Sequence, residues 1–158
     1  MAPVHVWTPV EDGSKLKDAR LRRLLAHWSA AAKHGRLPSK DIVDPEKLGD
    51  LMGWLFLYRV ERNPLRFLYL ICGPKVVRRL GIDMTGKYLD EHPDPQVRDA
   101  IAANFIAVLS TGKPHYRAAP RRLLHHEVTT EALVLPLGGP DGTIDHLLAL
   151  QIVGIPQE

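Results

Sequence analysis

The sequence predicts a single α+β domain in which helices cover an antiparallel sheet, and two observations carry this prediction. Two apolar runs, residues 54–60 and 65–72, flank a short polar segment whose Asn63-Pro64 step interrupts regular structure. We therefore expect a β-hairpin there. Directly after it, residues 76–80 place apolar side chains at helical spacing. A short helix after a hairpin is typical of a sheet with small helices on one side.

Before this hairpin, the sequence predicts one short extended segment and one amphipathic helix. Residues 4–10 are the extended candidate. Residues 15–34 follow the helical pattern, and Gly35 stands where a C-terminal cap belongs. One face of this helix must be buried, and its apolar residues include Leu21, Leu24, Leu25 and Trp28.

After the hairpin, a second clear helix and three further strands are expected. The helix has Asp94 as its N-cap and Pro95 at its first position, and it ends at Gly112. Its apolar face is formed by Val97, Ile101, Phe105, Val108 and Leu109. The strand candidates are residues 116–119, 123–137 and 144–153, and the glycine-rich segment 138–142 should connect the last two as a hairpin turn.

Composition narrows the class of protein. The chain has 158 residues, a single cysteine (Cys72) and a net charge of +3 with its basic residues dispersed. One cysteine rules out an intramolecular disulfide. No apolar run approaches the roughly 20 residues of a membrane span, and the first residues lack a signal-peptide pattern. We therefore expect a cytoplasmic domain without a membrane partner, and nucleic acid is not an expected partner.

A resemblance to a known family emerges from ordered motifs across most of the chain. From about Leu21 to Val153, the sequence resembles a PAS-domain family that occurs as short, largely stand-alone bacterial chains. The motifs are Leu37-Pro-Ser39, Asp44-Pro45, Phe67-x-Tyr69, Gly73, G-x-D-x-T-G at 81–86 and E-x-L-x-L-P-L at 131–137. The resemblance implies a PAS fold with a five-stranded antiparallel sheet, short helices on one face and a small-molecule cavity between them. We expect residues 1–36 to be an N-terminal extension with its helix and residues 37–158 to be the PAS domain.

Three other features suggest chemistry, and each has a plainer structural interpretation. The segment 81–87 satisfies G-x-x-x-x-G-K, but Tyr88 follows where a phosphate loop needs a small hydroxyl, so a connecting loop is favoured. Four histidines fall on candidate strands without metal-ligand spacing, so no metal site is expected; they are His115, His125, His126 and His146. Glu131 precedes an apolar strand, and we interpret it as a structural residue that is solvated or paired with an arginine.

The sequence also argues against a bound cofactor and against catalysis. A haem-binding PAS domain needs a ligand, usually a histidine, on a helix that faces the cavity, and neither predicted helix after the hairpin contains one. Flavin photosensors of this fold carry a cysteine in an Asn-Cys-Arg-Phe type of motif, whereas Cys72 ends a strand. No nucleophile with a base is evident. We expect no haem, flavin or metal, and no enzymatic activity.

The function predicted from the sequence is a sensory or regulatory module that binds a small apolar or amphipathic ligand and signals through an unknown protein partner. The alternative is a protein-interaction module with a filled core and no ligand. Alternation along strands places aromatic side chains on the inner face of the sheet, with helical residues closing the space above them. The expected ligand-binding residues are Phe56, Tyr58, Phe67, Tyr69, Ile71, Val77, Leu80 and Phe105.

The outer face of the hairpin suggests a homodimer. With the aromatic residues inside, Leu55, Leu57, Leu68, Leu70 and Cys72 should point outward, and such an apolar patch needs a cover. The N-terminal helix could supply it within one chain, or helix and sheet together could form a two-fold interface, which we favour. The expected interface residues are Leu21, Leu24, Leu25 and Trp28.

Overall fold

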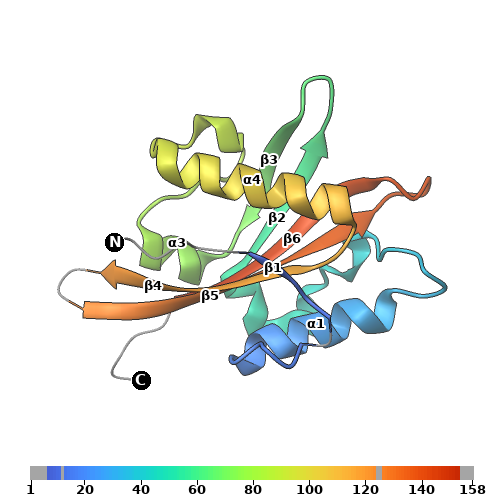
Figure 1. Ribbon diagram of the computed structural model, residues 1–158, viewed down its shortest axis with the longest axis horizontal. Helices are drawn as coiled ribbons and strands as arrows, with labels where there is room; N and C mark the ends of the chain where they lie inside the picture. Colours follow the sequence, from blue (N-terminus) through green and yellow to red (C-terminus); the bar gives the residue numbers. More distant parts are fainter. Residues whose placement is uncertain (1–6, 12, 124–125, 154–158) are drawn as a thin grey trace.

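The computed structural model describes residues 7–11, 13–123 and 126–153. One antiparallel sheet lies at its centre, with the strands in the order β1-β4-β5-β6-β2-β3 (Figure 1). β1 adds an edge to the five strands that were expected, because its two residues pair with β4. The strands are β1 (Thr8–Pro9), β2 (Leu55–Glu61), β3 (Arg66–Cys72), β4 (His115–Leu123), β5 (His126–Gly138) and β6 (Ile144–Val153).

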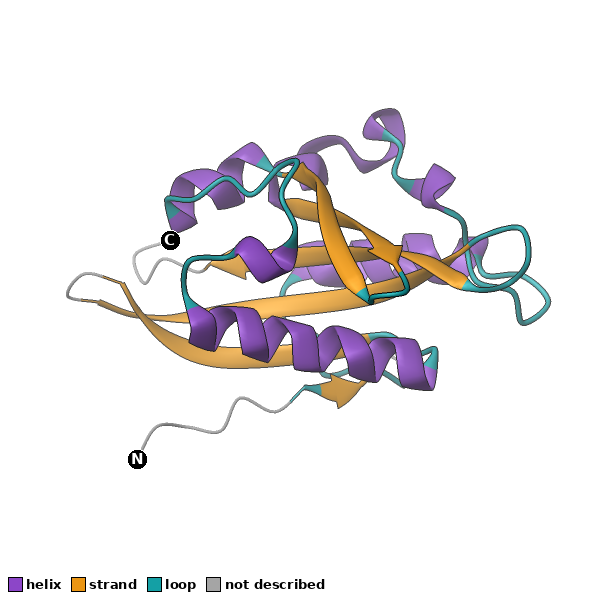
Figure 2. Ribbon diagram, turned by 90° about the horizontal axis from the view of Figure 1, so that it is seen from above, coloured by secondary structure: helices purple, strands orange, loops and turns teal. Residues whose placement is uncertain are grey.

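Helices cover both sides of this sheet. The long helix α4 (Pro95–Thr111) lies on one side and α1 (Ala19–Ala31) on the other (Figures 1 and 2). α3 (Pro74–Leu80) follows the β2–β3 hairpin directly, as the sequence predicts. The α+β architecture is therefore confirmed. The other helical segments are η1 (Lys40–Ile42), α2 (Pro45–Leu48), η2 (Gly49–Trp54) and η3 (Leu89–Glu91).

The ends of α4 are fixed by the capping residues that the sequence indicates. The Asp94 carboxylate accepts hydrogen bonds from the backbone N–H groups of Gln96 and Val97, at 3.0 and 3.4 Å. At the other end, Gly112 adopts a left-handed conformation with φ of 67°, which glycine permits without steric cost. Helix α1 is shorter than expected, because the side chain of Asp18 caps it by accepting from the Arg20 N–H.

The two faces of the sheet bury two different sets of side chains. Along β5, Ala132 and Val134 face α4, so Leu133 and Leu135 must point to the opposite side. Both leucines are completely buried. The side toward α1 is therefore a full apolar layer, to which α1 contributes Leu21 and Leu24, which are also completely buried.

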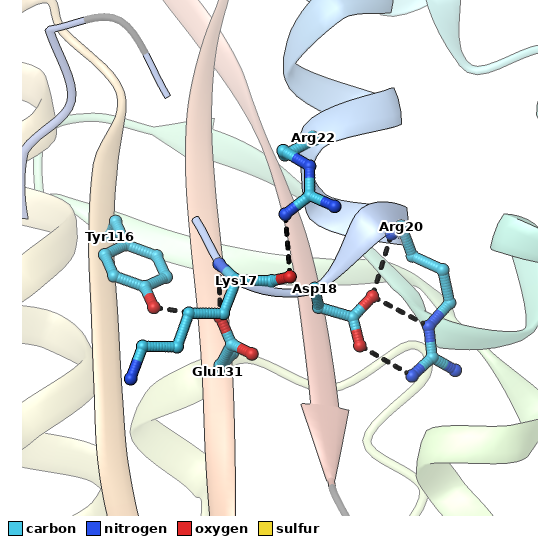
Figure 3. Close-up of polar contacts among 6 residues, drawn as sticks. All are labelled: Lys17, Asp18, Arg20, Arg22, Tyr116 and Glu131. Atoms are coloured by element: carbon cyan, nitrogen blue, oxygen red, sulfur yellow. Dashed lines mark hydrogen bonds and ion pairs between the residues drawn. The ribbon is translucent and has the colours of Figure 1, made fainter. Parts of the chain in front are cut away.

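Polar contacts at the start of α1 fasten it to the sheet (Figure 3). Glu131 of β5 accepts a hydrogen bond from the Lys17 backbone N–H at 3.2 Å and one from the Tyr116 hydroxyl at 2.8 Å. Near the other end, the indole N–H of Trp28 donates to the Pro136 carbonyl at 2.9 Å. The sequence suggests a structural Glu131 that is solvated or paired with an arginine; its partners are instead the Lys17 N–H and the Tyr116 hydroxyl, through which it joins the start of α1 to β4 and β5.

A β-bulge corrects the predicted face of Ile71. Leu57 pairs with Ile71, but the next residue, Tyr58, pairs with Tyr69, so Leu70 is an extra residue in β3. One extra residue inverts the alternation beyond it. Ile71 therefore shares the outer face of Leu57, and Cys72, opposite Phe56, takes the inner position. The predictions that Ile71 faces inward and Cys72 outward are wrong.

Some strand boundaries also differ from those expected. The strand predicted at 116–119 extends over His115–Leu123, and the one predicted at 123–137 begins only at His126. Residues 124 and 125, including the candidate histidine His125, lie outside the described residues. Of the extended candidate at 4–10, only Thr8–Pro9 is a described strand, and residues 4–6 are not described.

Candidate ligand-binding cavity

A cavity of about 490 Å³ lies between α4, the sheet and the segment that follows α3. This volume falls within the roughly 300–1,000 Å³ of small-molecule sites. Three lining residues of the first half of α4 are exposed to solvent, namely Gln96, Val97 and Ala100. The cavity therefore opens along this half of the helix and is closed toward the second half, where Asn104 and Phe105 are buried.

Small side chains on the sheet create this space. Ala132 and Val134 of β5 and Ala149 of β6 lie on the cavity face, and Val134 is paired directly with Ala149. Ala100 lies on the helical wall. Because protein interiors are otherwise closely packed, an alanine in place of a larger residue leaves volume that no other described residue fills.

Aromatic rings from β2, β3 and α4 form the end of the cavity. The centroid of the Tyr58 ring lies 4.6 Å from that of Tyr69 and 4.7 Å from that of Phe105. The Phe56 ring lies 6.0 Å from each of the two tyrosine rings. Burial raises the pKa of Tyr58 well above its ordinary value and that of Tyr69 to about 12, so both phenols are uncharged at neutral pH.

Asn104 is the most unusual residue of the lining. It is only 3% exposed, and neither its Oδ1 nor its Nδ2 has a hydrogen-bond partner among the residues that the structure describes. An unpaired buried amide costs about 1–3 kcal/mol, and most buried polar groups in native proteins are paired. A molecule in the cavity that bonded to this amide would remove the cost.

Two charged residues, Arg117 and Asp94, line the cavity, and each has a contact within the protein. The guanidinium carbon of Arg117 lies 4.8 Å from the centroid of the Trp7 ring, and both residues line the cavity. Asp94 is the only carboxylate among the described lining residues, and it is engaged as the N-cap of α4. Arg117 therefore places a guanidinium on the cavity wall, while the Asp94 carboxylate is held at the start of α4.

Five of the eight ligand-binding residues predicted from the sequence line the cavity: Phe56, Tyr58, Tyr69, Leu80 and Phe105. Phe67 is buried behind them, with its ring 5.1 Å from that of Phe105. Val77, which lies one turn before Leu80 in α3, is not among the lining residues. Ile71 is excluded by the bulge.

Sequence reasoning missed the polar half of the lining. Asn104, Arg117 and Gln151 were not singled out, and neither were the small residues of β5 and β6. A signal for Asn104 was present, because it follows Ile101 by three residues and precedes Val108 by four, which places it on the buried face of the helix. The sequence carries no comparable signal for Arg117 or Gln151.

The four residues proposed as a dimer interface lie within the protomer. Leu21 and Leu24 have no exposed surface, and Leu25 and Trp28 are partly buried against the same core. The interface prediction is therefore wrong for Leu21 and Leu24, because α1 packs these two side chains against β5 of its own sheet.

The other chemical candidates occupy structural positions. Within the described residues, no three His, Cys, Asp or Glu side chains are grouped as metal ligands would be. In the G-x-x-x-x-G-K segment, Gly81 caps α3 and the Asp83 carboxylate accepts from Thr85, so this is the expected connecting loop. No described helix combines the length and the apolar character that a membrane span requires.

Comparisons with known proteins give one family match. Residues 16–152 match the PAS domain family. No curated protein matches the chain. Similar solved structures include an RNA-binding light-oxygen-voltage receptor, with 17% identity and a TM-score of 0.49 over 97% of this chain and 39% of that one. The present chain thus spans well under half of the receptor.

Two shorter domains are also similar. The PAS domain of BvgS from Bordetella pertussis is 18% identical, with a TM-score of 0.41 over 63% of this chain and 75% of that one. The light-state structure of the Aureochrome1 LOV domain, from a blue-light photoreceptor, gives 13% identity and a TM-score of 0.42, over 67% and 84% of the two chains.

Proposed function

Because the chain belongs to the PAS domain family, whose members are generally sensory modules, we propose that it is a non-enzymatic module that binds a small apolar or amphipathic ligand in the cavity between α4 and the sheet. Signalling would pass to a protein partner. The homodimer expected from the sequence stays part of this proposal, with its interface outside Leu21 and Leu24.

The observation that carries the proposal is the unpaired amide of Asn104 inside a cavity of ligand size. A filled core would bury an apolar residue at this helix position and would leave no volume beside Ala132 and Ala149. The alternative, an interaction module without a ligand, accounts for neither feature. The two observations favour ligand binding over that alternative.

The test is to denature the purified protein and identify released compounds by mass spectrometry. Ala149→Leu, which adds side-chain volume at the cavity wall, serves as the blocking variant, and Ala30→Leu, at an exposed position of α1, is the matched control. We expect one compound in near-stoichiometric amount from the wild type and from Ala30→Leu, and much less from Ala149→Leu. Release of no compound from the wild type, or of equal amounts from all three proteins, would favour the filled-core module.

A further inference from the structure

The unpaired amide restricts what the polar group of a ligand can be. An asparagine side chain offers two N–H donors and a carbonyl acceptor. Both Oδ1 and Nδ2 of Asn104 lack a partner among the described residues. If the positions of the oxygen and nitrogen were exchanged, the amide would still need both a donor and an acceptor. A single group that satisfies both ends must donate and accept through neighbouring atoms, as a carboxamide does.

The charges around the cavity narrow the ligand further. A cationic ligand would meet Arg117, and the only carboxylate of the described lining, Asp94, is engaged at the start of α4. An anionic carboxylate carries acceptors only, so it could accept from the Nδ2 of Asn104 but would leave its Oδ1 without a donor. Taking either ion out of water also costs hydration energy, and the one guanidinium of the lining, that of Arg117, would offset this cost only for an anion.

The aromatic and aliphatic walls of the cavity determine what kind of apolar body the ligand can have. Phe56, Tyr58, Tyr69 and Phe105 present rings, and the helix and the loop after α3 add aliphatic groups such as Ile82 and Ile101. These surfaces favour an apolar body that contains a ring, because offset and edge-to-face contacts between rings add to the burial of apolar area.

We propose that the cavity takes an uncharged ligand in which a carboxamide-type group, bonded to Asn104, is attached to an apolar ring body. This proposal rests on the proposed function, since it assigns the chemistry of the same site. Asn104 selects the polar group by pairing with both its donor and its acceptor.

The experiment compares three compounds that share one ring and differ only in the polar group. They are 1-naphthaleneacetamide, which donates and accepts, 1-naphthylacetone, which only accepts, and 1-naphthaleneacetate, which is an anion. Each is titrated by calorimetry into protein that has been freed of any co-purifying compound by unfolding and refolding. We expect the amide to bind at least about fivefold more tightly than either analogue, because each analogue leaves part of the buried amide unpaired.

Two variants separate the role of Asn104 from that of its helix. Asn104→Leu keeps a similar volume without the amide, and we expect the preference for 1-naphthaleneacetamide over the ketone to fall to about onefold while the ketone still binds. Ile106→Leu is the control on the same helix, because Ile106 is 51% exposed, and it should retain the wild-type preference. If Asn104→Leu does not fold, the side-chain NH₂ signal of Asn104 in the wild type gives the same answer, since the amide should shift it most.

The outcomes distinguish this inference from the proposed function. Equal affinity for the three compounds, tighter binding of the acetate, or an unchanged preference in Asn104→Leu would overturn the carboxamide assignment while leaving a ligand-binding cavity. If the three compounds fail to bind and the purified protein releases a compound of another class, the assignment also fails and the proposed function stands. If nothing binds and nothing is released, both fail.

Discussion

At the scale of single residues, Asp18 links the stability of the protein to pH. Its carboxylate caps α1 by accepting the Arg20 backbone N–H at 2.8 Å, and it also accepts from the Arg20 guanidinium at 2.8 and 3.0 Å (Figure 3). The hydrogen bonds from the Arg20 side chain are the main cause of a lowered Asp18 pKa, and they outweigh the partial burial that raises it. The folded protein therefore stabilises the charged form of the Asp18 carboxyl relative to the unfolded chain.

We predict that this contribution disappears in acid. Because the pKa of Asp18 is lower in the folded protein than the ordinary 3.8, its stabilising effect is complete above that value and is lost as the pH falls through the folded pKa. Urea unfolding at pH 6 and pH 3 should show a smaller loss of stability for Asp18→Asn than for the wild type, since asparagine also caps helices but does not titrate. Asp99→Asn, at a side chain that is 78% exposed, is the control. Equal losses in wild type and Asp18→Asn would contradict the assignment.

Single residues also show where sequence reasoning succeeds and where it fails. The alternation rule placed Phe56, Tyr58 and Tyr69 on the cavity because β2 itself contains no extra residue and Tyr69 lies on the turn side of the bulge in β3. It failed for Ile71, because a bulge depends on how two strands fit together and leaves no local pattern. Asn104 lay on a recognisable helix face, but the fact that it lacks a partner is a property of the packed structure.

At the scale of elements, the caps of α4 and the turns of the two hairpins could be predicted, because they depend on residues close in sequence. The segments η1, α2 and η2 were not assigned, since short helices carry too few residues for a periodic pattern. The amphipathic stripe of α1 was found, but its partner surface was not. A stripe indicates that a helix face is buried and does not say which chain buries it.

The placement of α1 gives a prediction for Leu24→Glu. Leu24 is completely buried against its own sheet, so the charged variant must place a carboxylate in an apolar layer or release the helix. We expect the free energy of unfolding to fall by about 3–5 kcal/mol, comparable with the larger losses for buried leucines. Ala26→Glu, at an exposed position of the same helix, should change it by less than about 0.5 kcal/mol.

Chemical denaturation and light scattering together decide between cover and interface. A Leu24→Glu protein that keeps the stability of the wild type but has half its molecular mass would show that Leu24 belongs to a dimer interface after all. Loss of stability at an unchanged mass is the result expected from the packing of α1 within one protomer.

At the scale of the whole molecule, the sheet separates two interiors with different roles. The side toward α1 is a complete layer of leucines, among them Leu133, Leu135 and Leu148, all without exposed surface. The side toward α4 has small residues, a cavity and an unpaired amide. The leucine layer on the α1 side stabilises the fold. This stability allows the α4 side to keep an unfilled cavity, which has fewer packing contacts than a filled core.

This division predicts that residues 37–158 do not fold as an independent domain. Removing α1 would expose the leucines beneath it, and each fully buried leucine contributes about 1.5–3 kcal/mol relative to exposure. Losing several of these contributions removes an amount comparable with the roughly 5–15 kcal/mol by which a domain is stable. The match to the PAS domain family also begins at residue 16, before α1. A chain of residues 37–158 should therefore give no cooperative thermal transition, whereas a control chain of residues 15–158, which retains α1, should unfold cooperatively. If the shorter chain melts cooperatively near the temperature of the control, α1 is an accessory to the domain and the leucine layer is stable without it.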